Sequence, residues 1–155
     1  MKKYVNELIS WSQKLECGIK VIDEQHKGLV ELVNEMFDHV TGNYVQERDY
    51  FNRAITEAVE YIKNHFATEE KIMLATKFED YAEHKREHES FIIAVVKHIR
   101  EYKSGKRHTL SSFTRFLRDW ILSHIALVDK KYFEYLKSIA VRKDDGTLSV
   151  SLNAH

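Results

Sequence analysis

The sequence predicts an all-α fold, an antiparallel up-down-up-down four-helix bundle with an N-terminal arm and a C-terminal tail. The 155 residues include no proline and only five glycines, so the chain has little material for the tight turns of an all-β fold. Apolar residues recur with the helical period in four blocks separated by short clusters of helix-breaking residues. These observations favour one four-helix domain, residues 1–140, followed by a tail, residues 141–155.

The N-terminal part divides into an arm and the first helix. Residues 1 to about 18 are expected to form the arm, with Trp11 and Leu15 as its apolar anchors. The first helix is predicted from about residue 19 or 23 to residue 40, because Thr41-Gly42-Asn43 follows as a helix-breaking cluster.

Three further helices and a tail follow along the chain. The second helix is predicted at about residues 46–75, and the third from about residue 79 to Ser104-Gly105. The fourth begins near residue 109 or 111 and reaches about residue 140, with room for a break on the way. Residues 141–155 lose the helical pattern, and we expect this tail to be partly disordered.

The composition excludes several classes of protein. Lysine plus arginine number 24 and aspartate plus glutamate number 24, so the chain has no excess of basic residues. Such an excess would be expected if the partner were a nucleic acid or an anionic membrane. The single cysteine, Cys17, excludes an intrachain disulfide and a cysteine-based metal cage. The N-terminus is too polar for a signal peptide, and the longest apolar run, residues 91–96, is too short to span a membrane. We expect a soluble cytoplasmic protein.

Nine histidines are the unusual feature of the composition. On the predicted helices, five of them fall on the apolar stripes that a bundle must bury. The inward polar residues are, in helix order, His26 on the first helix, His65 and Glu69 on the second, His84 and His88 on the third, and His124 on the fourth. Every helix of the bundle therefore turns at least one histidine inward.

A metal site explains so many inward polar groups best. A buried polar group without a partner costs about a few kcal/mol, and a domain's net stability is only roughly 5–15 kcal/mol. One inward histidine alone, such as His26 or His124, is more often a hydrogen-bonded core residue, but the joint placement of five favours ligands. Imidazole and carboxylate suit iron, zinc, manganese or copper, so the residue types leave the metal open.

Three pairs of candidate ligands lie close together in the sequence, and the spacing of two of these pairs supports a metal site. Two pairs lie four residues apart and so share a helix face: His65 with Glu69, and His84 with His88. Asp129 follows His124 by five residues, which rotates it by roughly 140° around an ideal helix. The last pair therefore requires a helix distortion or a reaching side chain.

The number of candidate ligands narrows the kind of site. Seven are too many for one tetrahedral zinc ion, and they suit two ions bridged by two carboxylates. No histidine has a glutamate three residues before it, which excludes a ferritin-like Glu-x-x-His site, and His-Glu-x-x-His is also absent. The remaining histidines lie off the stripes, beyond the cluster or outside the helices, and are expected to be non-ligands: His39, His98, His108 and His155.

Four segments carry the candidate ligands in order: Ile22-Asp23-Glu24-Gln25-His26-Lys27, His65-Phe66-Ala67-Thr68-Glu69-Glu70-Lys71-Ile72-Met73, His84-Lys85-Arg86-Glu87-His88, and Trp120-Ile121-Leu122-Ser123-His124-Ile125 followed by Asp129. This ordered set resembles the hemerythrin family, and the prokaryotic bacteriohemerythrins in particular. The resemblance covers about residues 11–132. Glu79 stands where the family often has proline, Cys17 replaces an aliphatic residue and the tail is longer, but none of these departures touches a ligand.

The resemblance implies a non-haem di-iron centre (Fe2+/Fe3+) with an oxo or hydroxo bridge. The implied ligands are His84, His88 and His124 on one iron, His26 and His65 on the other, and Glu69 and Asp129 bridging both. The two-histidine iron would keep an open position for dioxygen. Reversible binding needs a dry pocket, for which Leu29, Phe66, Trp120 and Ile121 are the candidate walls, with Tyr132 as a further neighbour of the site.

The function that the resemblance implies is reversible dioxygen binding, for storage, transport or sensing, by a protein that is not an enzyme. Alternatives from other classes remain open at this point: a di-iron peroxidase, nitric oxide detoxification, an iron store, or repair of nitrosative damage. Dioxygen is the one partner implied, and the sequence leaves the oligomeric state undetermined.

Overall fold

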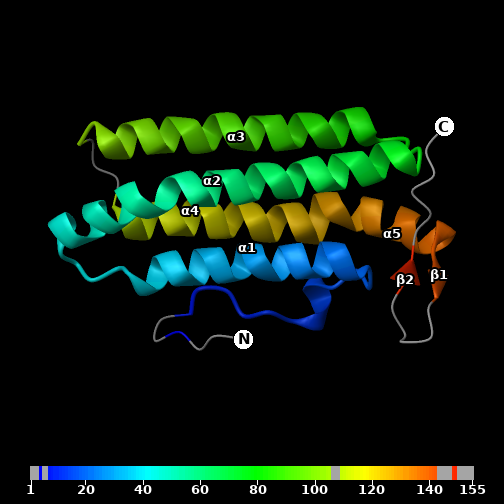
Figure 1. Cartoon of the computed structure of the whole chain (residues 1–155), viewed down its shortest axis with the longest axis horizontal. Helices are drawn as coiled ribbons and strands as arrows, with labels where there is room; N and C mark the ends of the chain where they lie inside the picture. The colour runs from blue at the N-terminus through cyan, green and yellow to red at the C-terminus, as the bar shows by residue number, and fades with distance from the viewer. Residues whose placement is uncertain (1–3, 5–6, 106–108, 143–147, 150–155) are drawn as a thin grey trace.

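The computed structural model has the predicted all-α architecture (Figure 1). It describes residues 4, 7–105, 109–142 and 148–149. Its helices are α1 (Lys20–Asp38), α2 (Tyr44–Ala75), α3 (Tyr81–Lys103), α4 (Leu110–Ser123) and α5 (Asp129–Ile139). A 3-10 turn, η1 (Gln13–Leu15), precedes α1, and a π-helical turn, η2 (His124–Val128), joins α4 to α5.

Each helix of the bundle packs against its neighbours in the ring. Helix α1 packs against α2 and α4, and α2 packs against α3. Aromatic contacts complete the ring between α3 and α4, where the rings of Phe91 and Trp120 stack with centroids 3.7 Å apart. Because the stripes of all the helices meet along one axis, the inward histidines converge in the middle of the bundle.

Local capping sets where the helices begin. The Asn43 side chain accepts a hydrogen bond from the Gln46 backbone N–H at the start of α2. One turn later, the Glu47 carboxylate accepts bonds from the Thr41 and Gly42 backbone N–H groups. Thr109 and Ser112 form a reciprocal capping box at the start of α4. These bonds satisfy backbone donors that a helix start leaves free, and they extend α2 two residues before its predicted start.

The fourth helix of the bundle is interrupted by the π-helical turn η2. The backbone N–H of Asp129 bonds to the carbonyl of His124, five residues earlier instead of four. The extra residue in this turn brings Asp129 beneath His124, on the face where an α-helix would have placed residue 128. Of the two alternatives that the five-residue spacing left open, a helix distortion or a reaching side chain, the structure has the distortion.

The N-terminal arm lies along α1 and is fixed by a buried asparagine (Figure 1). The Asn34 side chain accepts hydrogen bonds from the Leu8 and Ile9 backbone N–H groups at 2.9 and 2.8 Å, and donates one to the Ile9 carbonyl at 2.8 Å. Ile9 and Leu15 are buried, while Trp11 is partly buried against the core. The predicted anchors are thus present, but sequence reasoning missed Asn34 and Ile9.

Replacing Asn34 with alanine should release the arm. The variant loses three hydrogen bonds, two of them fully buried, and we expect the free energy of unfolding to fall by about 2–3 kcal/mol. Urea unfolding of the metal-free protein measures this change. Asn64→Ala, at an exposed asparagine of α2, is the matched control and should change stability little. Equal losses in the two variants would contradict the role of Asn34.

The tail contains a short antiparallel ladder. Strand β1 (Val141–Arg142) pairs with β2 (Leu148–Ser149), with Val141 opposite Ser149. Sequence reasoning did not anticipate this pairing. The expectation of disorder falls largely on residues 143–147 and 150–155, which lie outside the described part of the chain. Among the residues described, no helix combines the length and apolarity needed to cross a membrane.

Candidate metal centre

Seven polar side chains converge at the centre of the bundle. Each is at most 4% exposed, and they come from four helices and the π-helical turn. They fall into two groups in which every ligand atom lies within 4.8 Å of the others: Glu69, His84, His88, His124 and Asp129 in the first, and His26, His65 and Glu69 in the second. The structure therefore brings together every residue proposed from the sequence as a ligand.

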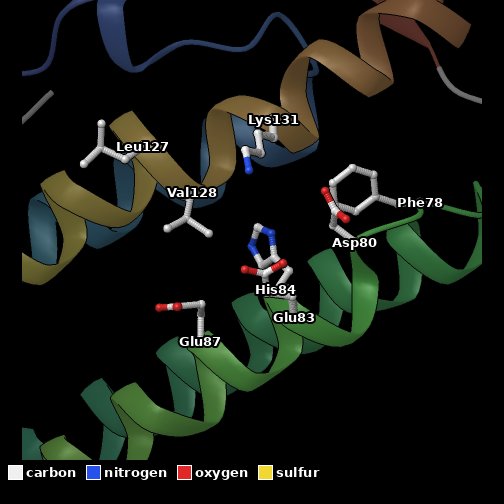
Figure 2. A pocket seen from close by; sticks show the side chains of 8 residues that line it. All are labelled: Phe78, Asp80, Glu83, His84, Glu87, Leu127, Val128 and Lys131. Carbon is white, nitrogen blue, oxygen red and sulfur yellow. The ribbon is translucent and has the colours of Figure 1, made fainter.

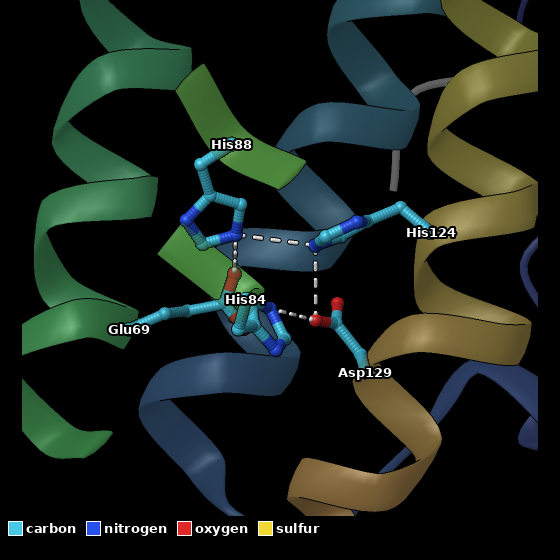
Figure 3. A group of neighbouring side chains, drawn as sticks. All are labelled: Glu69, His84, His88, His124 and Asp129. Atoms are coloured by element: carbon cyan, nitrogen blue, oxygen red, sulfur yellow. Dashed lines mark hydrogen bonds and ion pairs between the residues drawn. The ribbon is translucent and has the colours of Figure 1, made fainter. Parts of the chain in front are cut away.

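The first group gathers three histidines (Figure 3). The Nε2 atoms of His88 and His124 lie 3.1 Å apart. Asp129 Oδ1 lies 2.9 Å from His84 Nε2 and 3.1 Å from His124 Nε2. Two nitrogen ligands held at right angles about 2.1 Å from one ion would be about 3 Å apart. The spacing of His88 and His124 therefore fits two nitrogens around a single ion, and the His84 ligand atom lies within 4.8 Å of both.

The second group contains only two histidines. Glu69 Oε1 lies 2.7 Å from His65 Nε2, and Glu69 Oε2 lies 4.0 Å from His26 Nε2. The second carboxylate also reaches this side, because Asp129 Oδ2 lies 3.5 Å from His26 Nε2. Glu69 Oε1 is 3.8 Å from His88 Nε2 in the first group. Both carboxylates thus lie between the three-histidine group and the two-histidine group.

Unsatisfied polar atoms test whether a metal fits this site. Among the described residues, eight buried side-chain atoms make no hydrogen bond of acceptable geometry: Nδ1 and Nε2 of His26, both carboxylate oxygens of Glu69 and of Asp129, His84 Nε2, and the Tyr132 hydroxyl. Buried polar atoms in proteins are rarely left without partners. Seven of the eight belong to the proposed ligands, and six of these are carboxylate oxygens or Nε2 atoms that face one another. Metal ions would satisfy these atoms, so the residues fit a metal centre.

Protonation of the cluster follows from burial and from the two carboxylates. Burial lowers the pKa of His26, and it lowers that of His88 to about 3, so both rings are neutral. Burial would also lower the pKa of His65, but the nearby Glu69 carboxylate outweighs it and raises that pKa. Histidine partners hold the pKa of Asp129 below its usual range despite burial, so this carboxylate stays ionised. Neutral imidazoles and ionised carboxylates are the forms that bind metal.

Two residues outside the ligand set fix histidine tautomers. His65 Nδ1 lies 2.8 Å from Gln25 Oε1, which only accepts, so Nδ1 donates, and Nε2, which faces Glu69, is the nitrogen that a metal would take. His88 Nδ1 donates in the same way to Glu70 Oε2 at 2.9 Å. Sequence reasoning missed both roles, although Gln25 and Glu70 are direct chain neighbours of two proposed ligands. Such partners orient metal-binding imidazoles and raise their basicity.

Aromatic rings cover the centre on the α3–α4 side. Phe66 stacks on His88 with ring centroids 3.9 Å apart, and Trp120 stacks on His124 at 4.4 Å. Phe133, which sequence reasoning missed, packs against His26 at 5.6 Å; it lies four residues after Asp129, a spacing that could have revealed it. The other two predicted wall residues are buried core residues: Leu29 and Ile121. The ligands thus sit in largely apolar surroundings.

Tyr132 is fully buried beside the cluster. Its ring lies 5.7 Å from that of His84, and its hydroxyl has no hydrogen-bond partner among the described residues. Burial and the charges of Glu69 and Asp129 raise its pKa, so the phenol keeps its proton. This placement agrees with the expectation that Tyr132 neighbours the site.

A surface cavity of about 150 Å³ lies beside His84, between α3 and the η2–α5 segment (Figure 2). Its rim carries Asp80, Glu83 and Glu87 from the α3 side and Lys131 from α5. His84 is therefore a candidate ligand that also borders a solvent-accessible hollow.

The structure places two of the predicted non-ligands away from the centre. His39 is exposed and stacks on Tyr50 with ring centroids 3.7 Å apart, and His98 packs on Phe116 at 4.1 Å. His108 and His155 lie outside the described residues.

The lowered pKa of His88 predicts acid sensitivity of the metal-free protein. Between pH 6.5 and about 3 the unfolded chain binds a proton at His88 that the folded chain does not, so the free energy of unfolding falls as the pH falls. From pH 7.5 to 5 we expect wild type to lose roughly 2 kcal/mol more than His88→Leu. Urea unfolding at the two pH values measures the difference. His39→Leu, at an exposed histidine, should follow wild type; identical pH profiles for wild type and His88→Leu would contradict the expectation.

The fold and the site together define a four-helix-bundle protein with a buried, histidine-rich metal site. Residues 17–136 match the family described as Hemerythrin HHE cation binding domain, and the chain belongs to the hemerythrin family. Proteins of this family are known for binding dioxygen at a non-haem di-iron centre. The resemblance found in the sequence is thereby confirmed.

Individual relatives agree with this assignment. The chain is 32% identical over 128 residues to the bacteriohemerythrin of Methylococcus capsulatus, which covers 81% of this chain and 94% of that protein. It is 33% identical over 131 residues to the bacteriohemerythrin of Stenotrophomonas maltophilia, covering 84% and 83% respectively. A crystal structure of wild-type hemerythrin superposes with a TM-score of 0.72 at 29% identity, covering 83% of this chain and 98% of that one.

Proposed function

We propose that this protein binds dioxygen reversibly at a di-iron centre. The proposed ligands are His84, His88 and His124 for one iron and His26 and His65 for the other, with Glu69 and Asp129 bridging. Iron held by these residues would supply the redox chemistry, with one electron for dioxygen from each of two ferrous ions. The proposal covers storage, delivery or sensing of dioxygen in the cytoplasm.

One observation carries this proposal: the ligand set is unequal on its two sides. Three histidine Nε2 atoms gather on one side of the carboxylates and two on the other. With both carboxylates shared, the two-histidine side has one protein ligand fewer. An incomplete ligand set is the usual mark of a site that takes an exogenous ligand, since purely structural sites are closed.

The chain's own residues favour binding over turnover. Phe66 and Trp120 cover the rings of His88 and His124, and Leu29 and Ile121 are buried core residues, so water is excluded from the part of the centre that the two aromatic rings cover. Excluding water protects a reduced centre from irreversible oxidation. Gln25 and Glu70 hold two imidazoles in the tautomer that leaves Nε2 free. The buried phenol of Tyr132 keeps its proton and so offers a donor, not a base, near the carboxylates.

Anaerobic reconstitution followed by oxygen titration tests the proposal. Protein loaded with two ferrous ions per chain should develop a visible absorption band on exposure to air and lose it under vacuum, over repeated cycles. His39→Leu, remote from the centre, should behave like wild type. A band that never returns after the first cycle, together with turnover of a peroxidase substrate or of nitric oxide, would support the enzyme alternative instead.

A further inference from the structure

The outer face of α3 carries a short stripe whose ends have opposite charge. Glu89, Ile93, Val96 and Arg100 follow one another at spacings of four, three and four residues. At about 100° per residue, the four positions fall within roughly 60° of the helix circumference. This alternation of four and three is the spacing of a coiled-coil seam. Ile93 in its middle is 71% exposed, although it is a large apolar side chain.

Two largely apolar grooves flank this stripe. One, of about 430 Å³, lies between α2 and α3, with Ala67 and Ile92 among its walls and Phe66 and His88 at its inner side. The other, of about 600 Å³, runs along α3 past Ile93 and Val96. Figure 1 shows α3 at one edge of the bundle, with the N-terminal arm on the opposite side along α1. The described part of the arm therefore does not cover this face.

We propose that α3 packs antiparallel on α3 of a second copy of the chain, about a two-fold axis midway between Ile93 and Val96. The spacings along the stripe are four, three and four residues in either direction. This axis therefore places Ile93 of one copy opposite Val96 of the other. It also places Glu89 opposite Arg100, twice in each dimer. A C2 interface requires such self-complementarity between the two ends of one surface. A parallel pairing would instead set like charges against each other.

Both charged ends of the stripe are exposed. Neither Glu89 nor Arg100 forms an ion pair among the described residues. Arg100 of a second copy would place a cation opposite Glu89 across the axis. The stripe is only four helical positions long, so the interface is small and the dimer should form reversibly as concentration rises.

Sedimentation equilibrium of the full chain, from micromolar to near-millimolar concentration, tests the pairing. Wild type should approach twice the monomer mass at the upper end, and Ile93→Glu should stay monomeric. Glu89→Arg and Arg100→Glu should each weaken association by about tenfold or more, because each sets two like-charged pairs across the axis. Far-UV circular dichroism and iron content should match wild type in all three variants, since these side chains lie outside the core and the centre.

Mixing the two charge variants distinguishes the antiparallel α3–α3 pairing from non-specific hydrophobic association. In a dimer of Glu89→Arg with Arg100→Glu, both cross-axis pairs regain opposite charges, so the mixture should associate like wild type while each variant alone does not. The double variant carrying both changes should also dimerise. Wild type that remains monomeric throughout, Ile93→Glu that dimerises as wild type does, or a mixture no stronger than its components would each overturn the proposal.

Discussion

Replacing His26 with leucine should make the metal-free protein more stable and the metal-loaded protein less stable than wild type. His26 is fully buried and neutral, and neither of its ring nitrogens has a hydrogen-bond partner among the described residues. An apolar side chain removes this cost, so the free energy of unfolding without metal should rise by about 2–4 kcal/mol. Iron binding should fall by at least one ion per chain, and with it the stabilisation that bound metal gives.

Paired unfolding curves, with and without ferrous iron under anaerobic conditions, measure both effects. Iron content after desalting gives the stoichiometry independently. His39→Leu is the matched control, because this histidine is exposed and stacked on Tyr50, and it should leave the iron content unchanged. If His26→Leu kept two iron ions and lost stability without metal, His26 would be an ordinary core histidine and the proposed ligand set would be wrong.

Inserting one residue in the π-helical turn should destroy the centre, whereas deleting one should preserve it. The turn already holds one residue more than an α-helical turn, and this brings Asp129 under His124. Removing Ala126, which is exposed, would convert the turn to α-helix and leave Asp129 on the same face. Adding an alanine after Ala126 would rotate α5 by about 100° and turn Asp129 out of the cluster.

The insertion should also damage the core. Three further side chains of α5 are buried, Tyr132, Phe133 and Leu136, and they would rotate together with Asp129. Losing them should lower the free energy of unfolding by more than about 3 kcal/mol and abolish iron binding. Iron analysis and urea unfolding of the two variants provide the comparison. An insertion variant that kept its iron, or a deletion variant that lost it, would show that the π-helical turn does not set the position of Asp129.

The sequence alone predicted the helices and the inward histidines, because both depend on the local helical period. His65 with Glu69, and His84 with His88, share a face by spacing alone, and the structure has each pair together in the cluster. The spacing of His124 and Asp129 also indicated that the fourth helix needs either a distortion or a reaching side chain at this point. It could not show the form of the distortion, because a π-helical turn has no residue signature as clear as a proline kink.

Only the tertiary structure decided which partners meet across the bundle. The hydrogen bond from His65 to Gln25 joins residues 40 positions apart, and the bond from His88 to Glu70 joins residues 18 positions apart. Helical periodicity fixes the face on which a side chain lies, but the packing of the helices fixes which atoms on facing stripes come within hydrogen-bonding distance. The hydrogen bonds of Asn34 to the arm were missed for the same reason. The helical period of the sequence therefore determined that these polar residues point inward. The family resemblance implied their division into three histidines and two, and the packing of the helices produces that division.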